Sequence, residues 1–412
     1  MKSTQQQTLL AGENLAEQNW WNRLCLNTVL RHLPELPYGS LDLLLPGGQV
    51  LQFGKARDGE PRAEIRLNNL RPLRRLLQAG ELGMAESYMA GEWDSPDLYS
   101  LFDWALGNEQ HMPELGKGKL WLRLLNRLLH WRHANTRRGS RRNIAYHYDL
   151  GNDFYRLWLD PSMTYSSALY AEPGQSLQAA QQNKYRRIAQ MLDLKPGQRV
   201  LEIGCGWGGF AELAAREFGV QVHGITLSRE QLIYARDRVV RAGLSGQCYF
   251  SLTDYRDIRE QYDHIVSIEM FEAVGEENWP VYFEQLRRCL RPGGAAVLQV
   301  ISIANERFEQ YRRNPDFIQR YIFPGGMLPS PERFSRELEG AGLRLDETQC
   351  FGKDYARTLA EWRHSFNEQW PRIQAQGFDE RFRRMWLYYL CYCEAGFDSR
   401  AVDVGLYRLA QA

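Results

Sequence analysis

A glycine-rich turn is the part of this sequence whose residue types and spacing most directly allow a ligand to bind. Residues 200–203 (VLEI) predict a buried strand, and residues 204–209 (GCGWGG) lead from it straight into a predicted helix. Glycines at such a turn let the backbone approach a ligand at the carboxyl edge of a sheet. The turn alone leaves three interpretations open, because it can serve a dinucleotide, a nucleotide or only a tight connection.

The residues around the turn favour S-adenosylmethionine over a nicotinamide cofactor. The spacing is GxGxGG rather than GxGxxG, and an acidic residue, Glu202, lies on the strand before the glycines. Asp254 and Tyr255 follow a later strand and are candidates for contacting an adenine ring. We therefore expect S-adenosylmethionine at this turn, with another cofactor of a Rossmann-like fold as the alternative.

Alternating short strands and helices must position the turn. The predicted strands are 199–203, 221–227, 264–268 and 295–303, the last after a turn at 291–294 (RPGG), and the predicted helices are 210–218 and 230–242. This alternation predicts parallel βαβ units. The expected fold class is therefore α/β, with a Rossmann-like doubly wound sheet of the methyltransferase type and a smaller N-terminal α+β domain.

The N-terminal part has a different pattern. Residues 1–40 show helical spacing of apolar residues, 39–54 read as a hairpin around a Pro-Gly-Gly turn, 63–67 as a third strand, and 69–106 as helical again. At 412 residues, two domains are the default expectation. The arginine-rich stretch 137–142 is the predicted boundary, which gives domains 1–136 and 137–412.

Residues 117–142 alternate apolar with basic side chains and contain no acidic residue. A helix with this pattern can lie in a bilayer interface, where each basic residue contributes about 1 kcal/mol near an anionic surface. It can equally be a packed helix followed by a solvated linker. The stretch therefore leaves membrane contact and homodimer formation open as roles for the N-terminal domain.

Charge and cysteine content narrow the class of protein. The formal net charge is +1, so no global field attracts nucleic acid or an anionic membrane. Seven cysteines occur without CxxC spacing, so we expect reduced thiols and no metal site. No apolar run approaches 18 residues and the N-terminus is polar, which predicts a cytoplasmic protein.

Six motifs in order resemble the cyclopropane-fatty-acyl-phospholipid synthase family, which includes the mycolic acid methyltransferases. The similarity runs from about residue 143 to the C-terminus and is weaker before it. The motifs are 146–155 (YHYDLGNDFY), 163–166 (MTYS), 201–209 (LEIGCGWGG), 224–228 (GITLS), 271–275 (FEAVG) and 321–326 (YIFPGG).

The resemblance implies a set of residues that contact S-adenosylmethionine. They fall at the carboxyl ends of three successive predicted strands and in one preceding loop, which are the positions that a doubly wound sheet offers to a ligand. The residues are Tyr165, Ser166, Glu202, Gly204, Cys205, Gly206, Gly208, Thr226, Leu227, Ser228, Gln231, Asp254 and Tyr255.

The resemblance also implies the reaction. The π bond of an unsaturated acyl chain attacks the sulfonium methyl group, and the carbocation that results loses a proton and closes a three-membered ring. Water must be excluded, and a base must lie near the new methyl group. Aromatic faces can stabilise the cation, although any one aromatic residue can equally be part of the core. The candidates are Tyr146, Tyr148, Phe271, Tyr321, Phe323 and Tyr355.

In the family the base is a bicarbonate ion. Glu272, Ile301 and Tyr355 stand where three of its ligands are expected, whereas Ser167 replaces a usual cysteine and Gln299 a usual histidine. Serine and glutamine still donate hydrogen bonds to an oxyanion, so bicarbonate stays a candidate second ligand with altered affinity and basicity. We hypothesise that the proton then leaves from a neighbouring carbon, which would give a methyl-branched unsaturated chain instead of a cyclopropane.

Cys393 matches a family cysteine once regarded as catalytic, but a thiolate has no step here because the alkene is itself the nucleophile. We expect Cys393 to be a buried thiol that shapes the lipid pocket. His147 is expected to act in the site as a hydrogen-bonding partner, and His364 to lie on the surface of an amphipathic helix.

The expected function is transfer of a methyl carbon from S-adenosylmethionine to a double bond of an unsaturated phospholipid, by an enzyme peripherally associated with the inner face of the membrane. Two alternatives stay open: a small-molecule N- or C-methyltransferase of the same fold, and a non-catalytic lipid-binding scaffold. A nucleic-acid partner is not expected, because charge is balanced and no aromatic RNA-binding motif occurs.

Overall fold

The computed structural model describes residues 26–29, 36–112 and 150–412. The described chain divides into two compact units, one of residues up to 112 together with 379–388, the other of 150–378 and 389–412. The predicted boundary at 137–142 and the basic stretch 117–142 lie outside the described residues, so the division into 1–136 and 137–412 stays a prediction. Among the described helices, none combines the length and the apolar character needed to span a bilayer.

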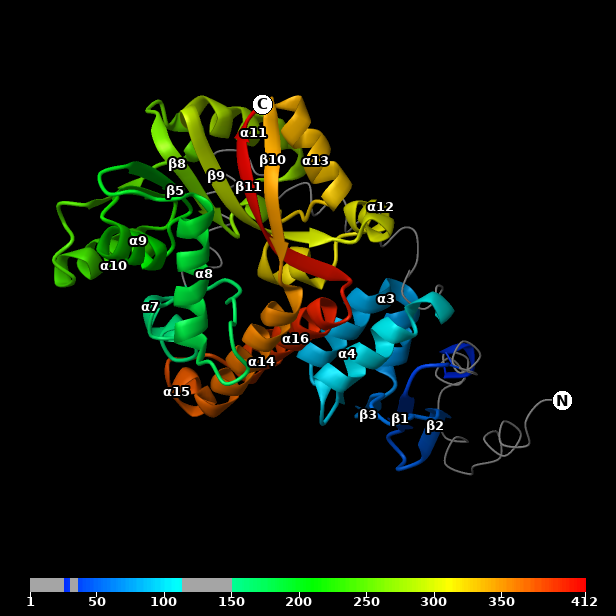
Figure 1. Cartoon of the computed structure of the whole chain (residues 1–412). Helices are drawn as coiled ribbons and strands as arrows, with labels where there is room; N and C mark the ends of the chain where they lie inside the picture. The colour runs from blue at the N-terminus through cyan, green and yellow to red at the C-terminus, as the bar shows by residue number, and fades with distance from the viewer. Residues whose placement is uncertain (1–25, 30–35, 113–149) are drawn as a thin grey trace. The chain divides into compact units, whose positions relative to one another are not determined.

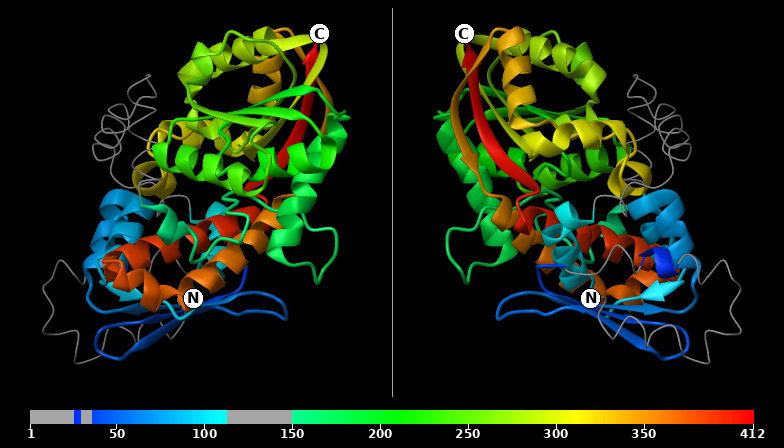
Figure 2. Two further views of the ribbon diagram at one scale, coloured as in Figure 1. Left: turned by 90° about the vertical axis from the view of Figure 1, so that its left-hand side faces the viewer. Right: turned by 90° about the vertical axis from the view of Figure 1, so that its right-hand side faces the viewer.

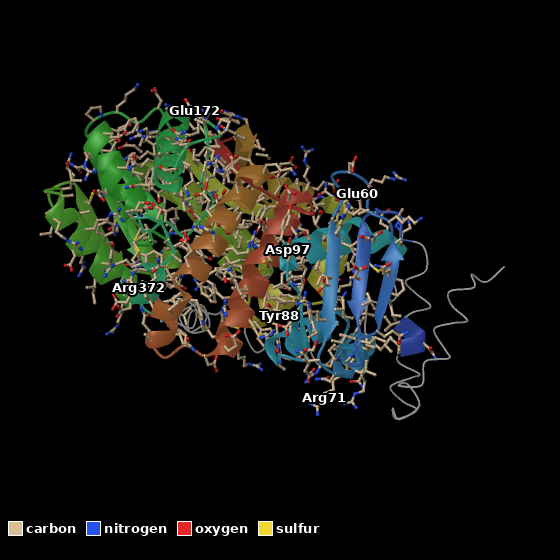
Figure 3. The ribbon with its side chains drawn as sticks, turned by 90° about the horizontal axis from the view of Figure 1, so that it is seen from below. Glu60, Arg71, Tyr88, Asp97, Glu172 and Arg372 are labelled. Atoms are coloured by element: carbon tan, nitrogen blue, oxygen red, sulfur yellow. The ribbon has the colours of Figure 1, made fainter. Side chains whose placement is uncertain are left out.

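The first unit contains a four-stranded sheet with the order β2-β1-β3-β4. The strands are β1 (Ser40–Leu44), β2 (Val50–Gly54), β3 (Arg62–Leu67) and β4 (Trp93–Asp94). β1 and β2 form an antiparallel hairpin, β3 pairs with β1 in parallel, and β4 is antiparallel to β3. The predicted hairpin and third strand are thereby confirmed, and Figure 3 shows the blue strands side by side with Glu60 just before β3.

Helices of the first unit lie mostly in the region 69–106 that was predicted to be helical, but the short strand β4 interrupts that region. They are α3 (Arg71–Met89), α4 (Leu98–Gly107) and the short 3-10 helix η2 (Glu109–His111). α3 is kinked where Gly80 has φ of 61° and ψ of −140°, a conformation that glycine adopts at little cost. The carboxylate of Asp97 caps α4 by accepting a hydrogen bond from the Tyr99 N–H at 3.0 Å.

The second unit is built on a seven-stranded sheet with the order β10-β11-β9-β8-β5-β6-β7, seen in Figure 1. From β9 to β7 all neighbours are parallel, whereas β11 is antiparallel to both β9 and β10. The strands are β5 (Arg199–Ile203), β6 (Gln221–Thr226), β7 (Cys248–Leu252), β8 (Tyr262–Ile268), β9 (Leu290–Ile303), β10 (Leu343–Cys350) and β11 (Val402–Gln411).

Helices cover both faces of this sheet. α9 and α10 pack against β6 and β7, whereas α11 packs against β8 and β9 and α13 against β10 (Figures 1 and 2). The helices of this unit are α7 (Asn152–Tyr155), α8 (Leu177–Met191), α9 (Gly209–Phe218), α10 (Arg229–Arg241), α11 (Trp279–Cys289), α12 (Asn305–Arg313), α13 (Pro331–Gly340), α14 (Gly352–Glu368), α15 (Trp370–Ala375) and the part of α16 (Glu380–Asp398) from residue 389 onward. Short turns are η3 (Tyr255–Asp257), η4 (Phe271–Ala273), η5 (Glu276–Asn278) and the π-helical η6 (Ile318–Ile322).

The predicted α/β fold with a doubly wound sheet is confirmed, and four predicted strands match β5, β6, β8 and β9. One detail differs: β9 begins at Leu290 and includes the turn predicted at 291–294. The pairing with β8 passes from Tyr262↔Leu290 to His264↔Ala295, so four residues oppose the single residue Asp263. Residues 291–294 therefore form a bulge-like irregularity within β9 rather than a turn before it.

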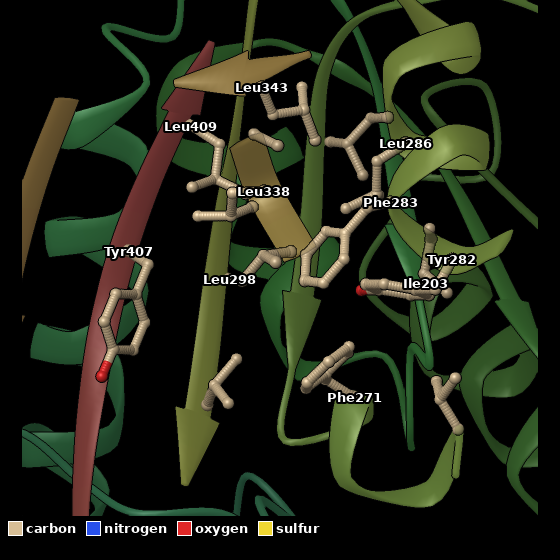
Figure 4. Packing of buried hydrophobic residues seen from close by; sticks show 14 of the residues in the cluster. Ile203, Phe271, Tyr282, Phe283, Leu286, Leu298, Leu338, Leu343, Tyr407 and Leu409 are labelled. Atoms are coloured by element: carbon tan, nitrogen blue, oxygen red, sulfur yellow. The ribbon is translucent and has the colours of Figure 1, made fainter. Parts of the chain in front are cut away.

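A buried apolar core lies on one face of this sheet. Figure 4 shows Leu298 of β9 and Leu409 of β11 facing Phe283 of α11 and Leu338 of α13. All four side chains are buried. Tight packing of this layer fixes the helices that cover the sheet, and thus the loops at its carboxyl edge.

The topology also fixes where a ligand can bind. From β5 the chain runs outward to β6 and β7 and then returns to β8 on the other side of β5. Such a reversal opens a crevice at the carboxyl ends of the strands, where doubly wound sheets bind their ligands.

Candidate active site

The glycine turn lies at the carboxyl end of β5. Gly204, Gly206 and Gly208 have φ of 81°, 51° and 80°, in the left-handed region that favours glycine. A Cβ atom on Gly204 would lie 2.8 Å from Met270, whereas one on Gly206 would meet nothing within 4 Å. The backbone at Gly206 therefore faces open space that a ligand can approach closely.

A cavity of about 940 Å³, counting its open mouth, lies against this turn. It is lined by residues from β5, from the ends of β6 and β8, and from the loop before α8. Ten of the predicted cofactor contacts line it: Tyr165, Ser166, Glu202, Gly204, Cys205, Gly206, Thr226, Leu227, Gln231 and Tyr255.

Three predicted contacts lie beside the cavity rather than on its wall, and each supports the wall. Gly208 ends the turn and packs closely, because a Cβ atom there would lie 3.1 Å from Ala235. Ser228 caps α10 through its Oγ, which accepts from the N–H of Gln231 at 3.3 Å. Asp254 is engaged in an ion pair with Arg256 at 2.6 Å.

The polar groups of the wall fit S-adenosylmethionine. Glu202 is buried, and within the described chain its Oε2 has no hydrogen-bond partner, nor has the Oη of Tyr255. Burial raises the pKa of Glu202 well above its usual range, while the positive charge of Arg238 opposes the shift. A cationic ligand with hydroxyl and amino donors would satisfy such an acceptor and favour its ionised form.

Glu269 is a site residue that the sequence analysis missed. It follows β8 directly and lines the cavity. Its Oε1 accepts hydrogen bonds from the backbone N–H of Ser167 at 2.7 Å and from the Nε2 of Gln299 at 2.6 Å. Its Oε2 accepts from the Oη of Tyr355 at 2.7 Å. Three donors from separate segments thus hold one carboxylate at the cavity wall.

The signal for Glu269 was present in the sequence. An acidic residue directly after a parallel strand falls at the edge where such sheets bind ligands. Its backbone also differs from that of most residues, because φ is 46°. A non-glycine residue in this region is uncommon, and such residues occur at functional sites.

Lys184 supplies a positive charge that acts on this carboxylate. It is fully buried in α8, and its Nζ donates to the Oγ of Ser166 and, at 2.7 Å, to the carbonyl oxygen of Ser167. Burial lowers the pKa of Lys184 to about 7, and the charge of Glu269 opposes that shift. Burial likewise raises the pKa of Glu269, and Lys184 opposes it. The two charges therefore stabilise each other.

Glu272 lies near Glu269 but makes a different contact. Its Oε1 accepts from the backbone N–H of Ile301 at 2.6 Å. Its Oε2 is buried without a hydrogen-bond partner among the described residues. Burial and the neighbouring charge of Glu269 raise the pKa of Glu272 to about 8, so Glu272 holds its proton at neutral pH.

The five residues expected to hold bicarbonate thus fall into two groups. Ser167, Gln299 and Tyr355 donate to Glu269, whereas Glu272 and Ile301 bond to each other. Three of the expected donors are therefore already engaged by a carboxylate of the chain itself. The residues present do not fit a separate bicarbonate ion at this position.

Other predicted residues are placed as follows. Cys393 is partly buried, and burial raises the pKa of its thiol far above neutrality, so no thiolate forms. His364 is exposed and lies 3.2 Å from Glu368, as expected for a surface residue. Phe271 belongs to the apolar core and stacks on Trp279, so it is a core aromatic. His147, Tyr146 and Tyr148 lie outside the described residues.

Aromatic side chains surround the cavity wall at Tyr165. Its ring centroid lies 5.3 Å from that of Trp362 and 5.5 Å from that of Trp158. Its Oη lies 2.9 Å from the Oη of Tyr389, whose ring is 6.2 Å from Phe323. Tyr355 continues this group with its ring 6.1 Å from Trp362. The surroundings of Glu269 are therefore apolar and aromatic on one side.

This arrangement suits electrophilic chemistry. A cavity with an acidic wall binds a positively charged methyl donor, and the neighbouring aromatic faces can stabilise a transient cation. The carboxylate of Glu269 beside them is only partly exposed and can accept a proton.

Comparison with known proteins gives a consistent picture. Residues 135–406 match the family model described as mycolic acid cyclopropane synthetase. A tuberculostearic acid methyltransferase of Mycobacterium tuberculosis is 40% identical over 342 residues, which cover 80% of this chain and 79% of that protein. The cyclopropane-fatty-acyl-phospholipid synthase of Escherichia coli is 39% identical over 360 residues, covering 86% of this chain and 89% of that protein.

The solved structures agree. A mycolic acid cyclopropane synthase in complex with SAH and CTAB is similar with a TM-score of 0.62 at 31% identity, covering 66% of this chain and 98% of that chain. The family match over residues 135–406 includes the sheet strands β5 to β10 and the glycine turn beside the cofactor cavity. The chain therefore belongs to the mycolic acid cyclopropane synthetase family and is an S-adenosylmethionine-dependent methyltransferase.

Proposed function

We propose that the protein transfers the methyl carbon of S-adenosylmethionine to a double bond of an unsaturated phospholipid acyl chain. When bound, S-adenosylmethionine supplies an electrophilic methyl group. The glycine turn and Glu202 would hold it, and Tyr165 and Ser166 line the same cavity. An alkene needs no activation by a nucleophilic side chain, which is consistent with the protonated thiol of Cys393.

The observation that carries this proposal is the extent of the similarity. The family model ends at residue 406, and only six residues follow it. The match to the Escherichia coli phospholipid synthase covers 86% of this chain, so it must extend well into the residues before 135. The N-terminal region is thus shared with a relative whose name specifies a phospholipid substrate.

Two products are compatible with this reaction. Loss of a proton from the transferred methyl group closes a cyclopropane ring, whereas loss from the adjacent chain carbon leaves a methyl-branched unsaturated chain. Ser167 and Gln299 depart from the family pattern. This departure supports the methyl-branched product, because the geometry of the base decides which proton is removed.

The test supplies labelled cofactor to defined lipids. Purified protein is incubated with S-adenosylmethionine carrying a ¹³C methyl group and with phosphatidylglycerol vesicles whose acyl chains are monounsaturated or fully saturated. We expect one labelled carbon in the unsaturated chains and none in the saturated ones, measured by mass spectrometry of the hydrolysed fatty acids. NMR then distinguishes cyclopropane ring protons from those of a methyl branch.

The same assay separates the alternatives. Label in the head group or in an added small amine, with none in the acyl chains, would indicate a methyltransferase for small polar substrates. Failure to bind S-adenosylmethionine in isothermal titration would indicate a lipid-binding scaffold without catalysis. Either result contradicts acyl-chain methylation.

We also propose that the enzyme works at the inner face of the membrane from the cytoplasm, because its substrate resides in a bilayer. Sedimentation with vesicles that do or do not contain anionic lipid tests this placement. Binding only to anionic vesicles would support the basic stretch 117–142 as the contact, whereas no binding to either would contradict it. Homodimer formation is the other role considered for the N-terminal region, and light scattering measures it directly.

A further inference from the structure

We propose that Glu269 is the general base of the reaction and that its carboxylate takes the place of a separate bicarbonate ion. The proposal rests on the proposed function, since a base is needed only if an alkene is alkylated and a carbocation forms. It makes the enzyme independent of dissolved carbonate.

The first argument is the convergence of donors. The N–H of Ser167, the Nε2 of Gln299 and the Oη of Tyr355 all donate to this carboxylate within 2.6–2.7 Å. All three partner residues are buried. The resemblance implies that these three residues bind a bicarbonate ion. In this chain they bind the carboxylate of Glu269 instead.

The second argument is access. Glu269 is partly exposed, and it lines the same cavity as Glu202 and Tyr165. It therefore faces the space in which the methyl donor binds. A base must reach the protons of the new methyl group or of the adjacent chain carbon, and a residue on the shared wall meets that requirement.

The third argument is charge. The titratable groups that act on Glu269 come from several elements: Lys184 on α8, Glu272 on η4, Tyr355 on α14, and Tyr389 and Cys393 on α16. Lys184 is the cation among them, while Glu272 keeps its proton near neutral pH because burial raises its pKa to about 8. Glu272 therefore adds little negative charge, and Lys184 and Glu269 each favour the ionised form of the other.

The step balances without any further reagent. After methyl transfer the acyl chain carries a carbocation. A C–H bond breaks, and its electron pair forms either the third ring bond or a new C=C bond. The proton goes to a carboxylate oxygen of Glu269, which becomes neutral and later returns the proton to solvent. No oxidant or reductant takes part.

The first experiment compares Glu269→Gln with Glu276→Gln. Glutamine keeps the shape but cannot accept the proton, so we expect Glu269→Gln to form product about 100-fold more slowly or worse, measured at saturating S-adenosylmethionine. Glu276 pairs with Arg312 away from the cavity, and its substitution should leave turnover unchanged. Full turnover and the same product from Glu269→Gln would overturn the proposal.

The second experiment tests whether the enzyme needs bicarbonate. The wild-type enzyme should keep full activity in buffer freed of carbon dioxide. Glu269→Gly suits the backbone at this position and exposes the three donors, so added bicarbonate or formate should restore part of its activity. Loss of wild-type activity on removing carbonate, with recovery on adding it back, would show that bicarbonate is the base.

The two proposals fail in distinguishable ways. If no label enters the acyl chains with the wild-type protein, the proposed function fails before Glu269 is tested. If label enters and Glu269→Gln transfers it equally well, methylation stands and the base is another group. Melting temperature and binding of S-adenosylmethionine, measured on every variant, separate loss of the base from loss of the fold.

Discussion

Two carboxylates line the same cavity in opposite states. Glu202, on β5, has a buried oxygen without a hydrogen-bond partner in the described structure. Glu269, directly after the neighbouring strand β8, accepts three hydrogen bonds from protein donors. A ligand must supply a hydrogen-bond donor to the unpartnered oxygen of Glu202, whereas residues of the chain supply three donors to Glu269.

This difference teaches how to assign roles to buried acids in a single site. An incompletely bonded acceptor gains most from a donor that arrives with the ligand, so it indicates binding. Several protein donors and a nearby cation stabilise the ionised form of a carboxylate, which can then accept a proton, so such a carboxylate indicates chemistry. Substitutions at the two positions should therefore change different measured constants.

The largest expected effect in this comparison, after that of Glu269→Gln, belongs to Glu202→Gln. An amide keeps one acceptor but loses the charge that favours a cationic ligand, so affinity for S-adenosylmethionine should fall about 10-fold to 100-fold. Turnover at saturating cofactor should change little. Isothermal titration and steady-state kinetics measure the two constants, and a variant with normal affinity but lost turnover would reverse the assignment.

Lys184→Met tests the electrostatic coupling between Lys184 and Glu269. Removing the cation disfavours the ionised carboxylate and raises the pKa of Glu269. When the pH is lowered, activity should therefore begin to fall at a higher pH than in the wild type. We expect the acidic limb of the pH profile to move upward by about one pH unit or more. Cofactor affinity serves as the control, because Lys184 also holds the carbonyl oxygen of Ser167. An unmoved acidic limb would contradict the coupling.

Tyr355→Phe removes one of the three donors to Glu269 while keeping the aromatic ring. Two donors remain, so the rate at neutral pH should fall by only about threefold to 10-fold and recover partly at higher pH. The pH profile is the readout that a purely structural effect would not change. If the rate does not recover at alkaline pH, the hydrogen bond from Tyr355 does not help to keep Glu269 ionised.

The smallest effect is expected from Cys393→Ser. Its thiol stays protonated because burial raises its pKa, and the proposed reaction has no step for it. Turnover per folded molecule should stay within about threefold of the wild type, even if a hydroxyl group at this partly buried position lowers the melting temperature. A loss as large as that of Glu269→Gln would mean that the sulfur takes part in the reaction.

Much of the fold could be predicted because its signals are local. The turn at 204–209 and the strands around it are encoded by neighbouring glycines and apolar runs, and the structure places β5, β6 and β8 within two residues of the predicted strands. The cofactor wall follows from this topology, since parallel strands present their carboxyl ends at one edge.

The base site could not be read in the same way. Its donors come from residues 102 positions before, 30 after and 86 after Glu269 along the chain. The position of Glu269 directly after a predicted strand is a local signal, but no local pattern records that its three donors converge on it, and the resemblance assigns those donors to an external ion. The sequence alone shows that Ser167 and Gln299 differ from the family pattern. Only the three-dimensional structure shows that both residues donate hydrogen bonds to Glu269.

The left-handed backbone of Glu269 has a consequence for how this enzyme can change. Holding a side chain at φ of 46° costs about 1–2 kcal/mol relative to glycine, and confining a carboxylate in an apolar setting adds to that cost. Laboratory evolution toward heat resistance alone should therefore favour losing the acid at this position. A thermostable lineage that still keeps glutamate there would show that selection for turnover outweighs selection for a more relaxed fold.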